Sequence, residues 1–197
     1  MTAVRVAVLA SGGGTNLQAL IDALHDAPEA RVALVVTNRP HAGALDRARR
    51  GGIAATVLKN PDDPAELLAA LGPDTDLVVL AGYLKLVPPA VVARFRWKMI
   101  NIHPALLPAH GGPGMYGHRV HEAVLASGAA ESGATVHYVD EHFDRGPIIA
   151  QARVPVRPGD TPESLAARVL AAEHQLLPRV VLELARRGVP SQPVRIL

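Results

Sequence analysis

Residues 4–20 read VRVAVLASGGGTNLQAL, and this stretch decides the fold of the chain. Its beginning, 4–10, has the length and apolar composition of a strand buried on both faces, whereas leucines at helical spacing begin at Leu17. The three glycines between them allow a tight turn whose N–H groups point outward at a helix N-terminus. We therefore predict a strand–loop–helix unit whose loop binds an anion, with a phosphate group as the expected ligand.

This glycine loop matches neither the GxGxxG pattern of dinucleotide-binding proteins nor a Walker loop with its lysine. The second predicted strand ends in Thr37 and Asn38, where an NAD-dependent enzyme would carry an acidic residue for the ribose. NAD binding is therefore disfavoured. The alternative interpretation of the loop is a flexible connection in which Thr15 or Asn16 caps the helix.

Strand-length apolar runs alternate with segments of helical spacing through the first half of the chain, which is typical of βα units around a parallel sheet. From residue 134 onward consecutive strands follow one another, and this predicts antiparallel strands at one side. Thr161 and Pro162 provide an N-cap and a first position for a long C-terminal helix. The fold class is thus α/β, with a mostly parallel sheet, helices on both faces and antiparallel C-terminal strands. The predicted strands are 4–10, 31–38, 53–58, 76–82, 98–103, 134–140 and 148–156, and the other predicted helices are 17–25, 43–50, 64–71, 88–94 and 119–127.

The composition excludes several classes of function. The 197 residues, 49% of them hydrophobic, suit one domain with a substantial core, and no apolar run is long enough to cross a bilayer. The absence of cysteine excludes disulfides, thiolate catalysis and thiolate metal sites, and it favours a cytoplasmic location. The formal net charge is +2, and arginines such as Arg47, Arg49 and Arg50 are interpreted as solvated helix faces. We therefore expect neither a nucleic-acid surface nor a membrane partner.

A carboxamide and an imidazole stand two residues apart in the segment MINIHP, residues 99–104. Alternate residues of a strand share a face, so Asn101 can donate a hydrogen bond to a developing oxyanion while His103 handles the proton. Asp144 lies in a turn-like stretch, and a carboxylate brought beside His103 would raise the pKa of the imidazole. The alternative is that Asn101 and His103 are strand-end residues that bond to local backbone.

Five segments of the chain form a recognisable set: SGGGTNLQAL (11–20), LVVLAGYLKLV (77–87), NIHPALLP (101–108), SGATVHYVDEHFDRGPIIAQ (132–151) and AAEH (171–174). Together they resemble the 10-formyltetrahydrofolate-dependent formyltransferases, and the SGGGTN loop is typical of the phosphoribosylglycinamide branch and its formyltetrahydrofolate hydrolase relative. The resemblance implies one Rossmann-like formyltransferase domain over 1–197, with a nucleotide-phosphate-binding half (1–98) and a catalytic and folate-binding half (99–197). It also implies formyl transfer from the co-substrate 10-formyltetrahydrofolate to the amine of 5'-phosphoribosylglycinamide, in de novo purine biosynthesis.

The same resemblance implies roles for single residues. Asn101 and a protonated His103 would stabilise the tetrahedral oxyanion, while Asp144 would keep His103 charged and organise a water that carries the proton. No metal is implied. Two alternatives stay open, since 84–87 could be ordinary core and Glu173 a solvated helix residue. The residues implied for the ribonucleotide are Gly13, Gly14, Thr15, Asn16 and Glu173, and those for the folate are Leu84, Lys85, Leu86, Val87, Asn101, Val139, Asp140 and Asp144.

The sequence leaves open the cation for the folate tail, the oligomeric state and two competing functions. Many relatives carry an arginine near the folate tail where this chain has a shortened stretch, which leaves Lys85 or Arg145 as the cation. His118 and His121 would share one helix face, but we expect them to cap the helix or line the cleft rather than bind zinc, and His137 to be a structural partner of Asp144. The expected partners are small-molecule substrates of a monomer or homodimer. The competing functions are a formyltetrahydrofolate hydrolase and a non-catalytic phosphoribosyl-ligand binder.

Overall fold

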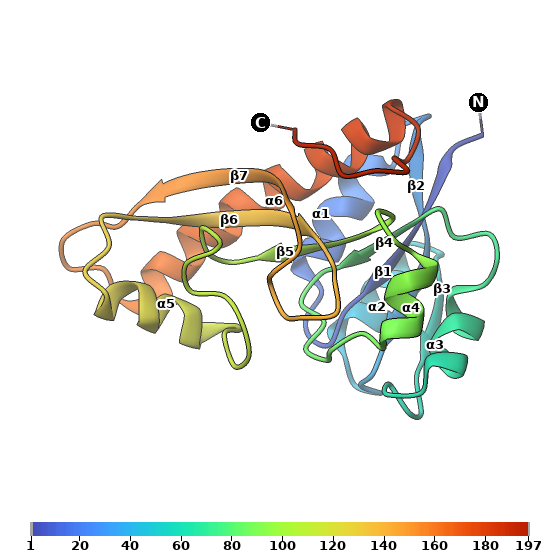
Figure 1. Cartoon of the computed structure of the whole chain (residues 1–197), viewed down its shortest axis with the longest axis horizontal. Coiled ribbons are helices and arrows are strands. Elements are labelled where there is room, and N and C mark those ends of the chain that lie inside the picture. The colour runs from blue at the N-terminus through green and yellow to red at the C-terminus, as the bar shows by residue number, and fades with distance from the viewer. Residues whose placement is uncertain (1, 197) are drawn as a thin grey trace.

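The computed structural model describes residues 2–196, which fold around one seven-stranded sheet (Figure 1). Every strand and helix predicted from the sequence is present, with small differences at the ends. The strands are β1 (Val4–Leu9), β2 (Ala30–Thr37), β3 (Ala54–Val57), β4 (Leu77–Leu80), β5 (Met99–His103), β6 (Glu131–Tyr138) and β7 (Ile148–Pro155). The helices are α1 (Thr15–Leu24), α2 (Gly43–Arg50), α3 (Pro64–Leu71), α4 (Pro89–Arg94), α5 (His118–Ala126) and α6 (Pro162–Arg186).

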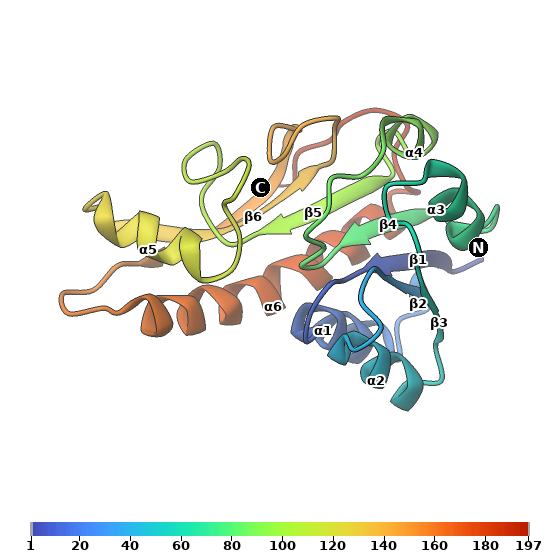
Figure 2. The same ribbon diagram turned by 90° about the horizontal axis from the view of Figure 1, so that it is seen from below.

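Strand alternation divides the core into two layers, one on each face of the sheet. Val6 and Val8 of β1 belong to a cluster with residues of α1, α2 and α6, whereas Ala7 and Leu9 belong to a second cluster with residues of α3 and α4. Figure 2 shows α1, α2 and α6 on one side of the sheet and α3 and α4 on the other. Both faces of β1 are therefore buried, which explains its largely apolar sequence.

The order of the strands creates a crevice at the carboxyl ends of two central strands. The order is β3-β2-β1-β4-β5-β6-β7, with parallel pairing from β3 to β5 and antiparallel pairing of β6 and β7, as predicted. The chain passes from β1 to β2 on one side and later returns to β4 on the other, so a crevice opens at the carboxyl ends of β1 and β4. The glycine loop after β1 and the segments that follow β4 and β5 meet there.

Local sequence fixes where two of the helices begin. The N-cap of α1 is Gly14, with φ of 72°, and no side chain caps this helix. The alternative in which Thr15 or Asn16 is the cap is therefore wrong, and the first amides of α1 keep their donors for another acceptor. At α6, Thr161 caps the helix as predicted and forms a capping box with Ser164. No helix within residues 2–196 is long and apolar enough to span a membrane.

Candidate active site

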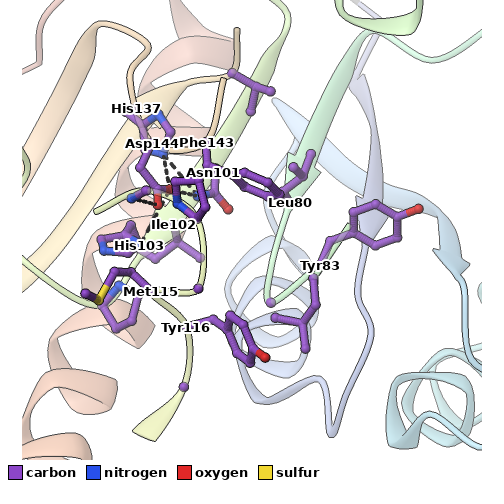
Figure 3. A pocket seen from close by; sticks show the side chains of 18 of the residues that line it. Leu80, Tyr83, Asn101, Ile102, His103, Met115, Tyr116, His137, Phe143 and Asp144 are labelled. Atoms are coloured by element: carbon purple, nitrogen blue, oxygen red, sulfur yellow. Dashed lines mark hydrogen bonds and ion pairs between the residues drawn. The ribbon is translucent and has the colours of Figure 1, made fainter. Parts of the chain in front are cut away.

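One cleft of about 640 Å³ contains most of the residues that the sequence singled out. The three predicted catalytic residues lie on one of its walls, and Tyr83 lies across from them (Figure 3). Both halves of the chain contribute to the cleft. The predicted residues that line it are Asn16, Leu84, Lys85, Leu86, Val87, Asn101, His103, Val139, Asp140, Asp144 and Glu173, whereas Gly13, Gly14 and Thr15 are not among its lining residues.

The register of the sheet fixes the orientation of Asn101. Asn101 on β5 is paired with His137 on β6, and Nδ2 of Asn101 lies 3.0 Å from Nε2 of His137. The other ring nitrogen, Nδ1, lies 2.7 Å from the carbonyl oxygen of Tyr138, which can only accept, so Nδ1 carries the proton. In the neutral ring Nε2 therefore accepts a hydrogen bond from Asn101, which turns the amide nitrogen of Asn101 toward the cluster. His137 also lies 3.5 Å from Asp144, which confirms the predicted contact.

Asp144 enters the cluster from the loop between β6 and β7. Its backbone φ is 58°, in the left-handed region that few non-glycine residues adopt. Oδ1 lies 3.5 Å from Nδ1 of His103 and 3.4 Å from Nδ2 of Asn101, and Oδ2 accepts the N–H of Gly112 at 2.9 Å. A Cβ on Gly111 would approach the Cβ of Asp144 to 3.1 Å, so this position favours glycine. The Gly111-Gly112 segment therefore packs against Asp144 and hydrogen-bonds its carboxylate.

Burial dominates the ionisation of His103. His103 is 3% exposed, and desolvation lowers the pKa of His103 below its ordinary value although Asp144 acts in the opposite direction. The expectation that Asp144 keeps His103 protonated is therefore wrong for the free protein. Burial alone would raise the pKa of Asp144, but His137, His103 and the N–H of Gly112 together hold it below its ordinary value. At neutral pH the cluster thus combines a neutral imidazole with an ionised carboxylate.

The hydrogen bonds of His103 indicate which tautomer is present. Nε2 lies 2.8 Å from the carbonyl oxygen of His110, so Nε2 carries the proton of the neutral ring. Its unprotonated Nδ1 then faces Oδ1 of Asp144 at 3.5 Å. Nδ1 of His103 and Oδ1 of Asp144 are both acceptors, so one additional proton between them would form a hydrogen bond. The pair is therefore arranged to receive a proton from a third group.

The part of the cleft lined by Asn16 and Glu173 is polar and buried. Nδ2 of Asn16, at the start of α1, donates to Oε2 of Glu173 on α6 at 2.5 Å. Burial raises the pKa of Glu173 to about 7, against the opposing effect of the Asn16 hydrogen bond. Oδ1 of Asn16 is buried without a hydrogen-bond partner within residues 2–196. The alternative of a solvated Glu173 is therefore wrong, because only 7% of the residue is exposed.

The glycine loop is braced by α2. Gly14 has a positive φ, and a Cβ there would lie 2.9 Å from the Cα of Ala44. Arg47 donates from Nε to the carbonyl oxygen of Gly13 at 2.7 Å and from Nη1 to Gln18 at 3.1 Å. The interpretation of Arg47 as part of a solvated face is therefore wrong. This arginine holds the loop and places a positive charge beside it, which adds to the partial charge of the α1 N-terminus.

The segment after β4 forms an apolar wall of the cleft. Leu84 and Leu86 are 39% and 41% exposed, so the alternative of ordinary core fails for them, whereas Val87 is only 2% exposed. Nζ of Lys85 lies 3.3 Å from Asp62, and Lys85 lines the cleft. Arg145 lines an adjoining cavity of about 680 Å³ instead. Of the two cations considered for the folate tail, Lys85 is thus the one inside the cleft.

Ser11 joins the loops that follow three strands, a role the sequence did not indicate. Its hydroxyl donates to Oδ1 of Asn38 at 2.6 Å and accepts the N–H of Leu84 at 3.0 Å, and its backbone N–H donates to the carbonyl of Gly82 at 3.0 Å. Ser11 is 1% exposed. One buried hydroxyl therefore connects the glycine loop to the apolar wall.

The two helix histidines line the cleft, as expected. His118 is the first residue of α5, and its Nε2 lies 3.3 Å from Glu163 and 3.6 Å from Glu122. His121 is buried. Across residues 2–196, no group of three or more histidine and carboxylate side chains is placed to hold a metal ion.

An amide donor, an imidazole and a carboxylate beside a phosphate-type loop define a centre for acyl-group chemistry without a nucleophilic side chain. Residues 4–181 match the family model described as formyl transferase, and the chain belongs to this family. It is similar to two proteins named phosphoribosylglycinamide formyltransferase, chloroplastic: 44% identical over 193 residues to that of Vigna unguiculata and 46% over 186 residues to that of Arabidopsis thaliana. These alignments cover 94% and 90% of this chain.

A solved structure extends the likeness to the whole fold. The crystal structure of glycinamide ribonucleotide transformylase 1 from Symbiobacterium toebii superimposes with a TM-score of 0.89 at 40% identity, and the match covers 100% of this chain and 95% of that one. The Rossmann-like formyltransferase fold implied by the sequence motifs is therefore confirmed. This chain spans 62% and 64% of the lengths of the two plant relatives, less than two thirds of each.

Proposed function

We propose that this protein transfers the formyl group of 10-formyltetrahydrofolate to the amine of 5'-phosphoribosylglycinamide, a step of purine biosynthesis. The observation that carries the proposal is the meeting of Asn101, His103 and Asp144 in a cleft that also holds the Asn16–Glu173 pair. The names of the relatives support formyl transfer and the same acceptor. The folate acts as a co-substrate, and the reaction uses no metal.

The proton path follows from the charge states of the cluster. The amine nitrogen attacks the formyl carbon, and its proton passes to Nδ1 of His103, directly or through a water. The new imidazolium then faces Asp144 at 3.5 Å and is stabilised by it. The bond between the formyl carbon and the folate nitrogen breaks as His103 returns the proton to that nitrogen. His103 therefore ends neutral, as it began.

Asn101 and the imidazolium would stabilise the oxyanion that forms between the two steps. Nδ2 of Asn101 points into the cluster because His137 accepts one of its hydrogens at 3.0 Å. Its second hydrogen makes only a 3.4 Å contact with Asp144, which is long for a hydrogen bond and is easily exchanged for a charged acceptor. The amide is thus oriented before substrate arrives, and orientation in advance is what makes such donors effective.

The two ends of the cleft would separate the two substrates. We assign the ribonucleotide phosphate to the amides of Gly13, Gly14, Thr15 and Asn16, and the ribose hydroxyls to Glu173. The folate ring would lie against the wall formed by Leu84, Lys85, Leu86, Val87, Val139 and Asp140, with Lys85 toward its acidic tail. This division would place the phosphate site in 1–98 and the catalytic centre in 99–197.

The remaining expectations are part of the same proposal. Free small molecules would be the partners of a monomer or homodimer, and light scattering of the purified protein measures which. The cysteine-free composition supports a reducing compartment, and we propose the cytoplasm. Microscopy of a fluorescent fusion tests that location.

An absorbance assay of folate deformylation, with and without the ribonucleotide, tests the function. We expect turnover only when the ribonucleotide is present. Equal turnover in its absence would instead establish a formyltetrahydrofolate hydrolase. Binding of the ribonucleotide without turnover of either kind would establish the non-catalytic binder.

A further inference from the structure

His121 is a buried titratable residue to which the proposed reaction gives no role. It lies on α5, is 5% exposed and lines the same cleft as His103. Its Nδ1 is enclosed by protein and has no hydrogen-bond partner within residues 2–196. Because buried polar atoms in folded proteins are nearly always paired, an unpaired imidazole in the wall of a cleft indicates a group that arrives from outside.

His121 lines the cleft from α5, whereas Glu173 lines it from α6. Contact between His118 and Glu163, at 3.3 Å, fixes the start of α5 beside the first turn of α6. Glu173 lies ten residues further along α6, which corresponds to about 15 Å of helix. His121, one turn further along α5, lines the same cleft as Glu173 and supplies a polar group from the α5 side. The other residues of α6 that line this cleft have only apolar side chains: Ala166, Ala167 and Leu170.

The linear order of the ribonucleotide identifies the part that would meet His121. Phosphate, ribose and glycinamide follow one another, so with the phosphate at the glycine loop and the ribose at Glu173, the glycinamide extends toward His103. We infer that His121 hydrogen-bonds the glycinamide amide and so aligns the attacking amine, which makes it a specificity residue for the acceptor. This inference rests on the proposed function.

The chemistry of His121 favours a neutral amide over the phosphate. Burial, followed by the nearby His118 and His103, lowers the pKa of His121 below its ordinary value. A neutral imidazole nitrogen is either a donor or an acceptor, so Nδ1 can pair with the carbonyl or with the N–H of an amide, according to the tautomer. A ring that resists charging is in contrast a poor partner for a dianionic phosphate.

The test compares two ligands that differ by the glycinamide group. Calorimetry would measure the binding of glycinamide ribonucleotide and of ribose 5-phosphate to wild type, His121→Leu and His121→Asn. We expect His121→Leu to lower the affinity for glycinamide ribonucleotide about fivefold to fiftyfold, in line with one buried polar group left unpaired. The affinity for ribose 5-phosphate should stay within about twofold, because this ligand does not make the contact that is lost. Asparagine keeps a donor and an acceptor close to the position of Nδ1 and should restore most of the loss. His25→Leu, at a histidine whose side chain is 79% exposed, is the matched control.

Nitrogen-detected NMR of the histidine rings gives a second readout that needs no variant to fold. The ring signals of His121 in wild type should shift on addition of glycinamide ribonucleotide and not on addition of ribose 5-phosphate. Unchanged signals with both ligands, or equal affinity losses for both ligands in His121→Leu, would overturn the inference. Failure of wild type to bind or formylate glycinamide ribonucleotide would instead overturn the proposed function, so the two failures are distinguishable.

Discussion

The proposed catalytic cluster and the proposed ribose end of the cleft, around Asn16 and Glu173, are both buried and polar, but they differ in how many of their polar atoms have a hydrogen-bond partner in the protein. In the cluster, nearly every polar atom has a protein partner: Asn101 meets His137, His103 meets the carbonyl of His110, and Asp144 meets Gly112. At the ribose end, Oδ1 of Asn16 has no partner within residues 2–196, and the cap of α1 leaves its first amides uncapped by side chains. The first region is fixed before substrate arrives, whereas the second is completed by it.

This difference predicts that changes in the cluster reduce the rate, while changes at the ribose end reduce affinity. Groups fixed in advance act on charge that develops in the transition state. Groups that lack partners gain hydrogen bonds as soon as the ligand binds, and their contribution appears in the ground state. The predictions below test that division.

The largest expected effect is on turnover, in His103→Ala and Asp144→Asn. Each should lower kcat about a hundredfold or more and change the dissociation constant of the ribonucleotide only a few-fold. Asparagine suits the test because it tolerates the φ of 58° at position 144 better than most residues. Stopped-flow turnover and calorimetry measure the two quantities. Near wild-type kcat in both variants would show that the cluster is not the catalytic centre.

The pH dependence of the rate gives the sign of the His103–Asp144 interaction. His103 must be neutral to accept the proton, so activity should fall on the acid side as His103 becomes protonated, with a midpoint below the ordinary histidine value. Asp144 raises the pKa of His103, and removing its charge in Asp144→Asn should therefore move the acid limb to lower pH. The residual activity of the variant, measured as kcat/KM against pH, tests this. A shift to higher pH would contradict the assignment.

Glu173 should make folding stability depend on pH. Its pKa is raised from 4.5 to about 7, so between these values the folded state holds a proton that the unfolded state has lost. The stability contributed by the protonated form is complete below pH 4.5 and is lost as pH rises through about 7, by about 3 kcal/mol in all. Glu173→Gln should remove this slope in urea unfolding at pH 5 and pH 8. The same slope in both proteins would place the titration elsewhere.

Gly14→Ala should raise the KM for the ribonucleotide about tenfold and leave the KM for the folate unchanged. A Cβ at this position combines a strained φ of 72° with a 2.9 Å approach to Ala44, so the loop amides must move, at a cost of about 1–3 kcal/mol. A substrate without its phosphate serves as the control, because its binding should lose much less. Equal losses for both ligands would mean that the phosphate binds elsewhere.

Ser11→Ala should have a smaller effect, confined to the folate. The change leaves the N–H of Leu84 without its acceptor and loosens the apolar wall, which should raise the KM for the folate about twofold to tenfold. Ser127→Ala removes a comparable hydroxyl bond at the end of α5 and is the matched control. An equal rise in the KM for the ribonucleotide would indicate a general loss of structure rather than a local one.

Removal of metal should have no effect at all. The proton on His103 and the amide of Asn101 take the part that a Lewis acid would otherwise play. Dialysis against a strong chelator, followed by elemental analysis and assay, measures this. Activity that is lost and then restored by one particular divalent ion would contradict the account.

The fold could be predicted from the sequence because the patterns that indicate its strands, helices and loops lie within short stretches of the chain. Apolar runs, the glycine loop and the Thr161-Pro162 helix start each act within a few residues. The start of β6 was placed too late, at 134 rather than Glu131, since Glu131 to Gly133 enter the sheet only by pairing with the end of β7. That pairing is a long-range property, and serine and glycine are weak strand formers.

Residues of the candidate site could be predicted where the chemistry of the side chain itself indicates a role. Residues whose role depends on contacts between distant parts of the chain could not. Asn101, His103 and Asp144 were found from their side chains, whereas the bracing of the loop by Arg47 and the link from Ser11 to Leu84 depend on residues far apart in sequence. The protonation of His103 was predicted wrongly for the same reason. Its neighbour was foreseen, but its 3% exposure, which decides the pKa, was not visible in the sequence.

The most direct measurement follows the formyl carbon itself. With 10-formyltetrahydrofolate labelled with carbon-13 at the formyl group, NMR of the reaction mixture would record where the label goes. The account predicts that it appears as a formamide on the ribonucleotide, at the same rate as the folate is deformylated, and that Asp144→Asn slows both together. Label recovered as free formate, with the ribonucleotide unmodified, would contradict it.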